Sequence, residues 1–94
     1  MPAELERAFD TALAQVARLL RADVSSANGD SARPQLERLE QELRRERASA
    51  VERGTVDCEW FQKMVRWVVE WVPDSELTLV AALGAILRAG PPAV

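Results

Sequence analysis

The one thiol of this sequence is that of Cys58, and a cysteine thiolate is the nucleophile of many enzymes. Cys58 is predicted to lie in the first turn of a helix, where the helix dipole favours the reactive thiolate. The carboxylates of Asp57 and Glu59 oppose that effect, because they favour the neutral thiol. We expect Cys58 to be a small structural residue, and the alternatives are a redox or nucleophilic role and a disulfide between two copies.

The residue types that the chain lacks argue against several classes of catalytic and metal-binding site. The chain has no histidine and no tyrosine, and most general-base, metal-binding and nucleophile–base arrangements depend on one of them. The sequence also lacks phosphate-binding glycine loops and zinc-ligand spacings. We therefore predict that the protein is not an enzyme and has no catalytic residues, no cofactor and no metal site.

One predicted helix nevertheless carries four glutamates and three arginines that suggest binding chemistry. They are Glu37, Glu40, Glu42, Glu46, Arg44, Arg45 and Arg47. Di-metal sites in helical bundles need inward-pointing acids together with a Glu-x-x-His motif, and here the histidine is missing. A nucleic-acid site needs a concentrated positive face, but residues 34–53 carry five arginines and five glutamates. We expect a solvated salt-bridge face and no nucleic-acid partner.

The most unusual stretch is WFQKMVRWVVEW, residues 60–71, which holds all three tryptophans of the chain. At about 100° per residue, its apolar residues cover an arc of about 200°, against about 100° for an ordinary surface helix. This arc divides into a Trp/Met side (Trp60, Met64, Trp67 and Trp71) and a Phe/Val side (Phe61, Val65, Val68, Val69 and Val72). Because Trp and Met are enriched in interface cores, we predict that the Trp/Met side contacts a partner, whereas Val68, nearer the centre of the arc, mainly stabilises the fold. Burial of the Trp/Met side in the monomer's own core is an equal alternative.

Hydrophobic periodicity predicts four helices, at about residues 3–22, 34–53, 57–72 and 75–89, with a loop at 23–33 rich in turn-forming residues. The expected helix ends are a C-cap at Gly54, a start near Asp57, an N-cap at Asp74 or Ser75, and a stop at residues 90–92. The fourth helix also has a small-residue side that includes Ala81, Gly84 and Ala85. Glycine inside a helix costs about 1 kcal/mol relative to alanine, and close approach of another backbone is one compensation.

The predicted fold is all-α, a single domain over residues 1–94 in a compact four-helix, bundle-like arrangement. We expect the hydrophobic hairpin of the third and fourth helices at its centre, with the first two helices packed on one side. Residues 55–94 carry only eight of the twenty-seven charged residues, and two one-sided helices do not cover so apolar a hairpin. We therefore predict that self-association completes the fold.

Composition also bears on location. The net charge is −3, and the single cysteine is typical of a reducing compartment. The charged segment MPAELERAFD does not resemble a signal peptide, and the longest uncharged run, residues 77–87, is too short to span a membrane as a helix. With an Ala/Arg/Glu-rich, lysine-poor composition typical of a high-GC bacterium, we expect a bacterial cytoplasmic protein that does not bind membranes.

The leading hypothesis for function is a non-catalytic protein-interaction module, a small adaptor, assembly or oligomerisation domain. The predicted interface residues lie on the third and fourth helices: Trp60, Met64, Trp67, Trp71, Ala81, Gly84 and Ala85. The predicted partner is a second copy in a homodimer, or another protein. The alternatives are a small binder of an apolar ligand in a Trp/Met-lined pocket, and an accessory subunit of a larger enzyme or of a signalling or defence complex.

Overall fold

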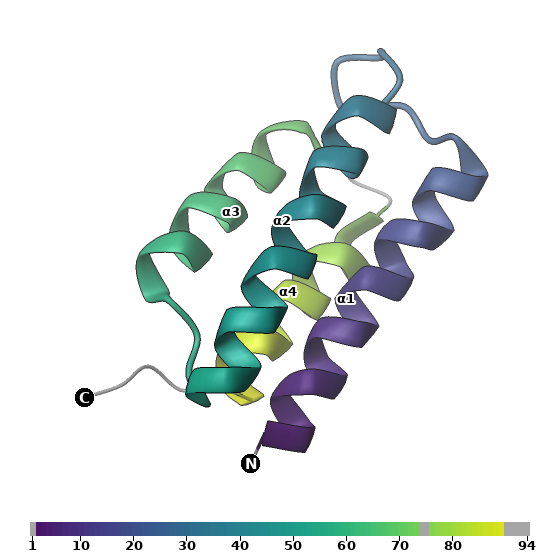
Figure 1. Ribbon diagram of the computed structural model, residues 1–94. Coiled ribbons are helices and arrows are strands. Elements are labelled where there is room, and N and C mark those ends of the chain that lie inside the picture. Colours follow the sequence, from purple (N-terminus) through teal and green to yellow (C-terminus); the bar gives the residue numbers. More distant parts are fainter. Residues whose placement is uncertain (1, 74–75, 90–94) are drawn as a thin grey trace.

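The computed structural model describes residues 2–73 and 76–89. This part of the chain forms four helices, α1 (Pro2–Ala22), α2 (Arg33–Arg53), α3 (Cys58–Trp71) and α4 (Leu77–Ala89), and the predicted all-α, bundle-like fold is confirmed (Figure 1). The observed helix ends differ from the predicted ones by at most two residues, as at the start of α4, which begins at Leu77 rather than 75. The predicted N-cap at Asp74 or Ser75 and the stop at residues 90–92 lie outside the described residues.

The turn between α2 and α3 shows why the end of α2 and the start of α3 were predictable from the sequence. Gly54 has a positive φ of 79°, and its N–H donates to the carbonyl of Ala50 at 2.7 Å, which closes α2. Asp57 caps α3, because its carboxylate accepts hydrogen bonds from the N–H groups of Glu59 at 3.0 Å and Trp60 at 3.2 Å. A connection this short places α3 antiparallel to α2 and beside it (Figure 1).

The helix with close neighbours on two sides is α1, which packs against both α2 and α4, whereas α3 approaches α4 less closely. The prediction that the α3–α4 hairpin forms the centre is therefore wrong. Small buried side chains, Ala8 and Ala12 in α1 and Ala82 in α4, allow helix axes to approach closely. The tryptophan rings of α3 are large and hold its backbone further from the bundle, although they contribute to the same core.

The core draws on all four helices. Its largest fully buried side chains are Leu5, Phe9, Val16, Leu19, Leu36, Leu39, Leu43, Val68, Leu79, Leu83 and Ile86. A single contiguous core of this kind is typical of one domain.

The connection between α1 and α2 is tied to the body of the domain. The N–H of Ala32 donates to the carbonyl of Val24 at 3.0 Å, and Gly29 turns the chain with a positive φ of 92°. In the same connection, the N–H of Ala27 donates to the carbonyl of Trp71 at 2.8 Å. This last hydrogen bond fixes the end of α3 and so helps to set which side of α3 faces inwards.

Candidate interaction surface

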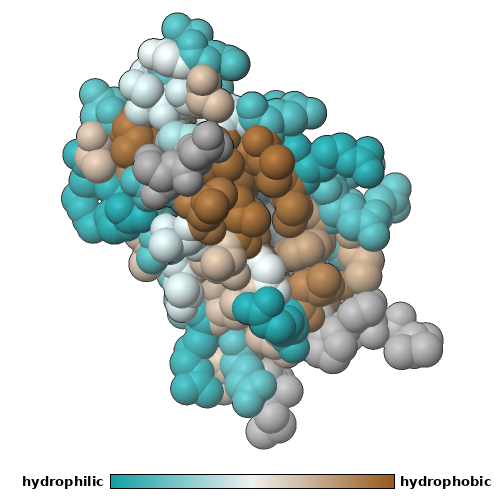
Figure 2. All heavy atoms as spheres, turned by 180° about the vertical axis from the view of Figure 1, so that it is seen from behind, coloured by the Kyte–Doolittle hydropathy of each residue, from teal (hydrophilic) through white to brown (hydrophobic). Residues whose placement is uncertain are grey.

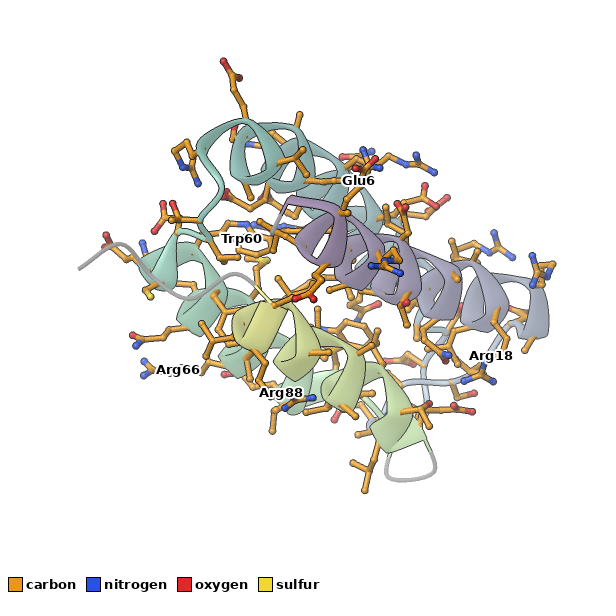
Figure 3. All side chains as sticks on the ribbon, turned by 90° about the horizontal axis from the view of Figure 1, so that it is seen from below. Glu6, Arg18, Trp60, Arg66 and Arg88 are labelled. Carbon is orange, nitrogen blue, oxygen red and sulfur yellow. The ribbon has the colours of Figure 1, made fainter. Side chains whose placement is uncertain are left out.

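The tryptophan side of α3 faces the other helices of the same chain. The Trp60 ring lies between the helices and packs against Phe9 of α1, with ring centroids 6.4 Å apart (Figure 3). Trp71 is only 4% exposed, and the Trp67 ring meets it edge-on at 5.3 Å and 64°. All three tryptophan rings are thus part of the core of a single copy or packed against it.

A cation–π contact fixes the edge of α3 that lies next to α2. The guanidinium of Arg38 lies 5.5 Å from the ring centre of Trp67, within the range of a favourable cation–π interaction. The ring N–H groups of Trp60 and Trp71 are buried and have no hydrogen-bond partner among the described residues. Apolar burial of the rings, rather than hydrogen bonding, therefore holds this side of α3 inwards.

The predicted Trp/Met interface residues are therefore buried or partly buried within the domain. Trp71 lies in the core, while Trp60, Met64 and Trp67 are partly buried. On the Phe/Val side, Val68 is buried as predicted and Phe61 is also buried, whereas Val69 is 57% exposed. The wide apolar arc of α3 is turned so that its centre, not its Phe/Val side, faces the core, and Val69 at one edge of the arc is left outside.

The small-residue side of α4 lies at the surface. Ala81 is exposed, and Gly84 and Ala85 are partly buried. A Cβ atom added at Gly84 would meet only the guanidinium of Arg88, at 3.6 Å. No other helix of the described chain therefore approaches Gly84 closely, so the predicted backbone contact does not come from the chain itself.

The exposed apolar residues of the hairpin gather at one end. Leu77 at the start of α4 is 62% exposed and Val69 near the end of α3 is 57% exposed, and the hairpin brings these two helix ends together (Figure 1). One helical turn away, Val65 precedes Val69 in α3 and Val80 follows Leu77 in α4, and both are only partly buried. Figure 2 shows apolar atoms gathered on one side of the molecule, with hydrophilic atoms around them.

We name this surface the α3–α4 face and define it by Val65, Val69, Leu77, Val80, Ala81 and Gly84. Sequence reasoning found Ala81 and Gly84 but missed Leu77. The signal was present, because Leu77, Ala81, Gly84 and Arg88 follow one another at spacings of four, three and four residues, and such residues share one side of a helix.

Two open depressions lie along the outer side of α3, and the first of them includes Val65 and Val69 of this face. One, of about 520 Å³, is lined by Phe61, Gln62, Val65, Arg66, Val69 and Glu70. The other, of about 420 Å³, is lined by Glu59, Gln62, Lys63, Arg66, Trp67 and Glu70. Neither combines tryptophan with methionine, and each is lined by the outer side of α3 alone. Neither of the two therefore matches the predicted Trp/Met-lined ligand pocket between the two helices.

The charged side chains of α1 and α2 pair with one another. Arg47 joins the two helices through Asp10 at 3.0 Å and Glu6 at 2.9 Å, and these contacts, the hydrogen bond to Asp10 first, raise the pKa of its guanidinium. Along α2 and its end, the pairs are Arg44–Glu40 at 3.8 Å, Arg45–Glu42 at 3.2 Å and Arg53–Glu46 at 2.8 Å. The arginines weighed for nucleic acid are thus balanced by carboxylates, as the sequence predicted.

The remaining candidates for chemistry are isolated. Within residues 2–73 and 76–89, no group of three or more His, Cys, Asp or Glu side chains is placed to hold a metal ion. Cys58 is the first residue of α3, partly buried and not in a disulfide. The carboxylate of Asp57 already accepts hydrogen bonds from the next free N–H groups of that helix end.

None of the described helices is long and apolar enough to cross a membrane. Comparison of the chain with protein-family models, with curated proteins and with solved structures gave no match.

Proposed function

We propose that this protein is a non-catalytic interaction module, a small adaptor or oligomerisation domain that binds a protein partner through the α3–α4 face. The observation that carries the proposal is the exposure of Val69, near the end of α3, and of Leu77, at the start of α4, the two large apolar side chains exposed among the described residues. A contiguous apolar patch on a small domain often marks a protein contact. On the opposite side, α1 and α2 carry paired charges, and no large apolar side chain of theirs is exposed among the described residues.

The small residues beside the patch support the same interpretation. Ala81 and Gly84 have side chains that protrude little from the backbone of α4, so a partner helix is able to approach that backbone closely. The predicted interface thus keeps Ala81 and Gly84 and gains Val69 and Leu77, while Trp71 stabilises the domain that presents them.

The test is retention of a partner by a tagged chain expressed in the cells that contain it naturally. The wild-type chain is compared with Val69→Glu and with a matched control, Gln41→Glu, at an exposed position of α2. We expect wild type and the control to retain the same protein, either untagged copies of the chain or another protein, and Val69→Glu to lose it. Equal retention by all three variants, or by none, contradicts the proposal.

A further inference from the structure

The connection between α1 and α2 contains a short hydrogen-bonded hairpin (Figure 1). Its two arms meet at Ser25 and Ser31 in an isolated antiparallel bridge. The N–H of Gly29 donates to the carbonyl of Ser26 at 2.9 Å, and the N–H of Ser26 donates to the carbonyl of Asp30 at 2.6 Å. The tip is therefore a three-residue loop, and Gly29, with a φ of 92°, supplies the left-handed residue that ends such loops.

This tip holds Asn28, the only asparagine of the chain, and Gly29 follows it directly. The base of the hairpin is buried, with Ser26 only 5% exposed, whereas the side chain of Asn28 is exposed. Asparagine is a thermolabile residue, because the backbone nitrogen of the next residue can attack its side-chain amide. Glycine in the next position leaves this attack unobstructed, since it has no side chain.

The hairpin opposes the same attack. The nitrogen of Gly29 holds its proton in the hydrogen bond to Ser26, so this bond has to break before the nitrogen is free to react. Exposed loop tips open locally at a small cost compared with unfolding of the whole domain. The reaction should therefore proceed in the folded chain, but more slowly than in the unfolded chain.

We propose that Asn28 is a site of spontaneous modification, where the nitrogen of Gly29 displaces the side-chain amide each time the hairpin opens, and that the isoaspartate so formed weakens the attachment of the hairpin to α3. The site needs no enzyme and no cofactor, and water is the only co-reactant.

The reaction has two steps. Hydroxide removes the proton of the Gly29 nitrogen, which bonds to the side-chain carbonyl carbon of Asn28 while the C–N bond of the amide breaks. The leaving nitrogen takes a proton from water and departs as ammonia, which restores the hydroxide. Water then opens the resulting succinimide ring at one of its two carbonyl carbons and leaves either aspartate or isoaspartate.

Isoaspartate changes the hairpin more than aspartate does. Its main chain runs through the former side-chain methylene, so the three-residue loop becomes one atom longer. The preceding residue, Ala27, donates its N–H to the carbonyl of Trp71 at 2.8 Å, and this bond fixes the end of α3. We expect the longer tip to move Ala27 and weaken that bond.

The test follows the purified wild-type chain and the control Asn28→Gln in slightly alkaline buffer, both folded and in urea. Trypsin should release Asn28 in the peptide of residues 22–38, because the bond before Pro34 resists cleavage. Mass spectrometry should show NH₂ replaced by OH in this wild-type peptide, and an isoaspartate methyltransferase should label it. We expect the folded chain to react about five- to a hundredfold more slowly than the chain in urea, because two hydrogen bonds hold the tip.

A second measurement tests the effect on α3. Anion exchange separates the aged chain, which carries one more negative charge, and its urea unfolding is compared with that of Asn28→Asp. That variant has the same charge and an unchanged main chain. If the bond from Ala27 to Trp71 is lost, the unfolding equilibrium constant of the isoaspartate form should be about fivefold larger than that of Asn28→Asp.

The other outcomes each overturn a stated part of the proposal. A reaction in urea but not in the folded chain means that the hairpin closes the site, and equal rates mean that the hairpin does not control it. The same mass gain in Asn28→Gln assigns the reaction to Gln35, the other amide of the peptide. An aged chain as stable as Asn28→Asp removes the link to α3. None of these results bears on the α3–α4 face, which the retention experiment tests.

Discussion

Two neighbouring valines of α3 offer a direct check on how the helix is turned. Val68 is fully buried and Val69 is 57% exposed, so Val68→Ala and Val69→Ala remove the same atoms from opposite environments. Two methyl groups are worth about 1.6 kcal/mol when fully buried, and the cavity left behind adds to this at Val68. Both changes gain about 0.5 kcal/mol of helix propensity, which cancels in the comparison.

The two variants should therefore lose different amounts of unfolding free energy. Val68→Ala should lower the free energy of unfolding by about 2 kcal/mol. At Val69 only the remaining 43% of the side chain is covered (100 minus 57), so its loss of about 0.7 kcal/mol is nearly offset by the propensity gain. Urea unfolding at a protein concentration where the chain is monomeric measures both, and with a slope of about 1 kcal/mol/M the two midpoints should lie about 2 M apart. Equal losses in the two variants would refute the assignment of Val69 to the surface.

Three further variants test other parts of the structure. Gly84→Ala should raise the stability of the monomer by up to about 1 kcal/mol in thermal or urea unfolding, because only the movable Arg88 side chain lies near the new methyl group; a loss of stability would show that another backbone packs there within one chain. Asp57→Ala removes the cap of α3 and should cost about 1 kcal/mol in the same measurement, and Asp57→Asn should recover most of it. Trp67→Ala should destabilise the monomer by about 2 kcal/mol, less than a fully buried tryptophan, through loss of its contact with Trp71; an unchanged unfolding midpoint with weakened association would instead return Trp67 to the interface.

The helices were predictable because their signals are local. Gly54 and Asp57 act on hydrogen bonds within one turn of their own helix, so a few residues decide where α2 ends and α3 begins. The prediction of a non-catalytic protein also came from composition, because the chain has no histidine.

The direction in which α3 faces was not predictable, because it depends on contacts between distant segments. An apolar arc of about 200° leaves several orientations with similar burial. The choice among them is made by Phe9 against Trp60, by Arg38 over Trp67, and by the hydrogen bond from Ala27 to the end of α3. These pairings join residues that are far apart in the sequence, so hydrophobic periodicity does not reveal them. The residue types therefore predicted an interface on the Trp/Met side, which in the fold is partly buried within the domain.

The residues of the α3–α4 face contribute less to the stability of the monomer than the tryptophans that the sequence suggested as an interface. Trp71 is part of the core. If such a tryptophan also contacted a partner, its replacement would weaken folding and binding together. Val69, Leu77 and Gly84 carry little of the monomer's own packing, since two are more than half exposed and the third has only a flexible neighbour. Substitutions at these three positions should therefore change partner binding while the unfolding free energy of the monomer stays constant or rises. If binding and monomer stability instead fall together at all three, the α3–α4 face is a structural surface and not a binding surface.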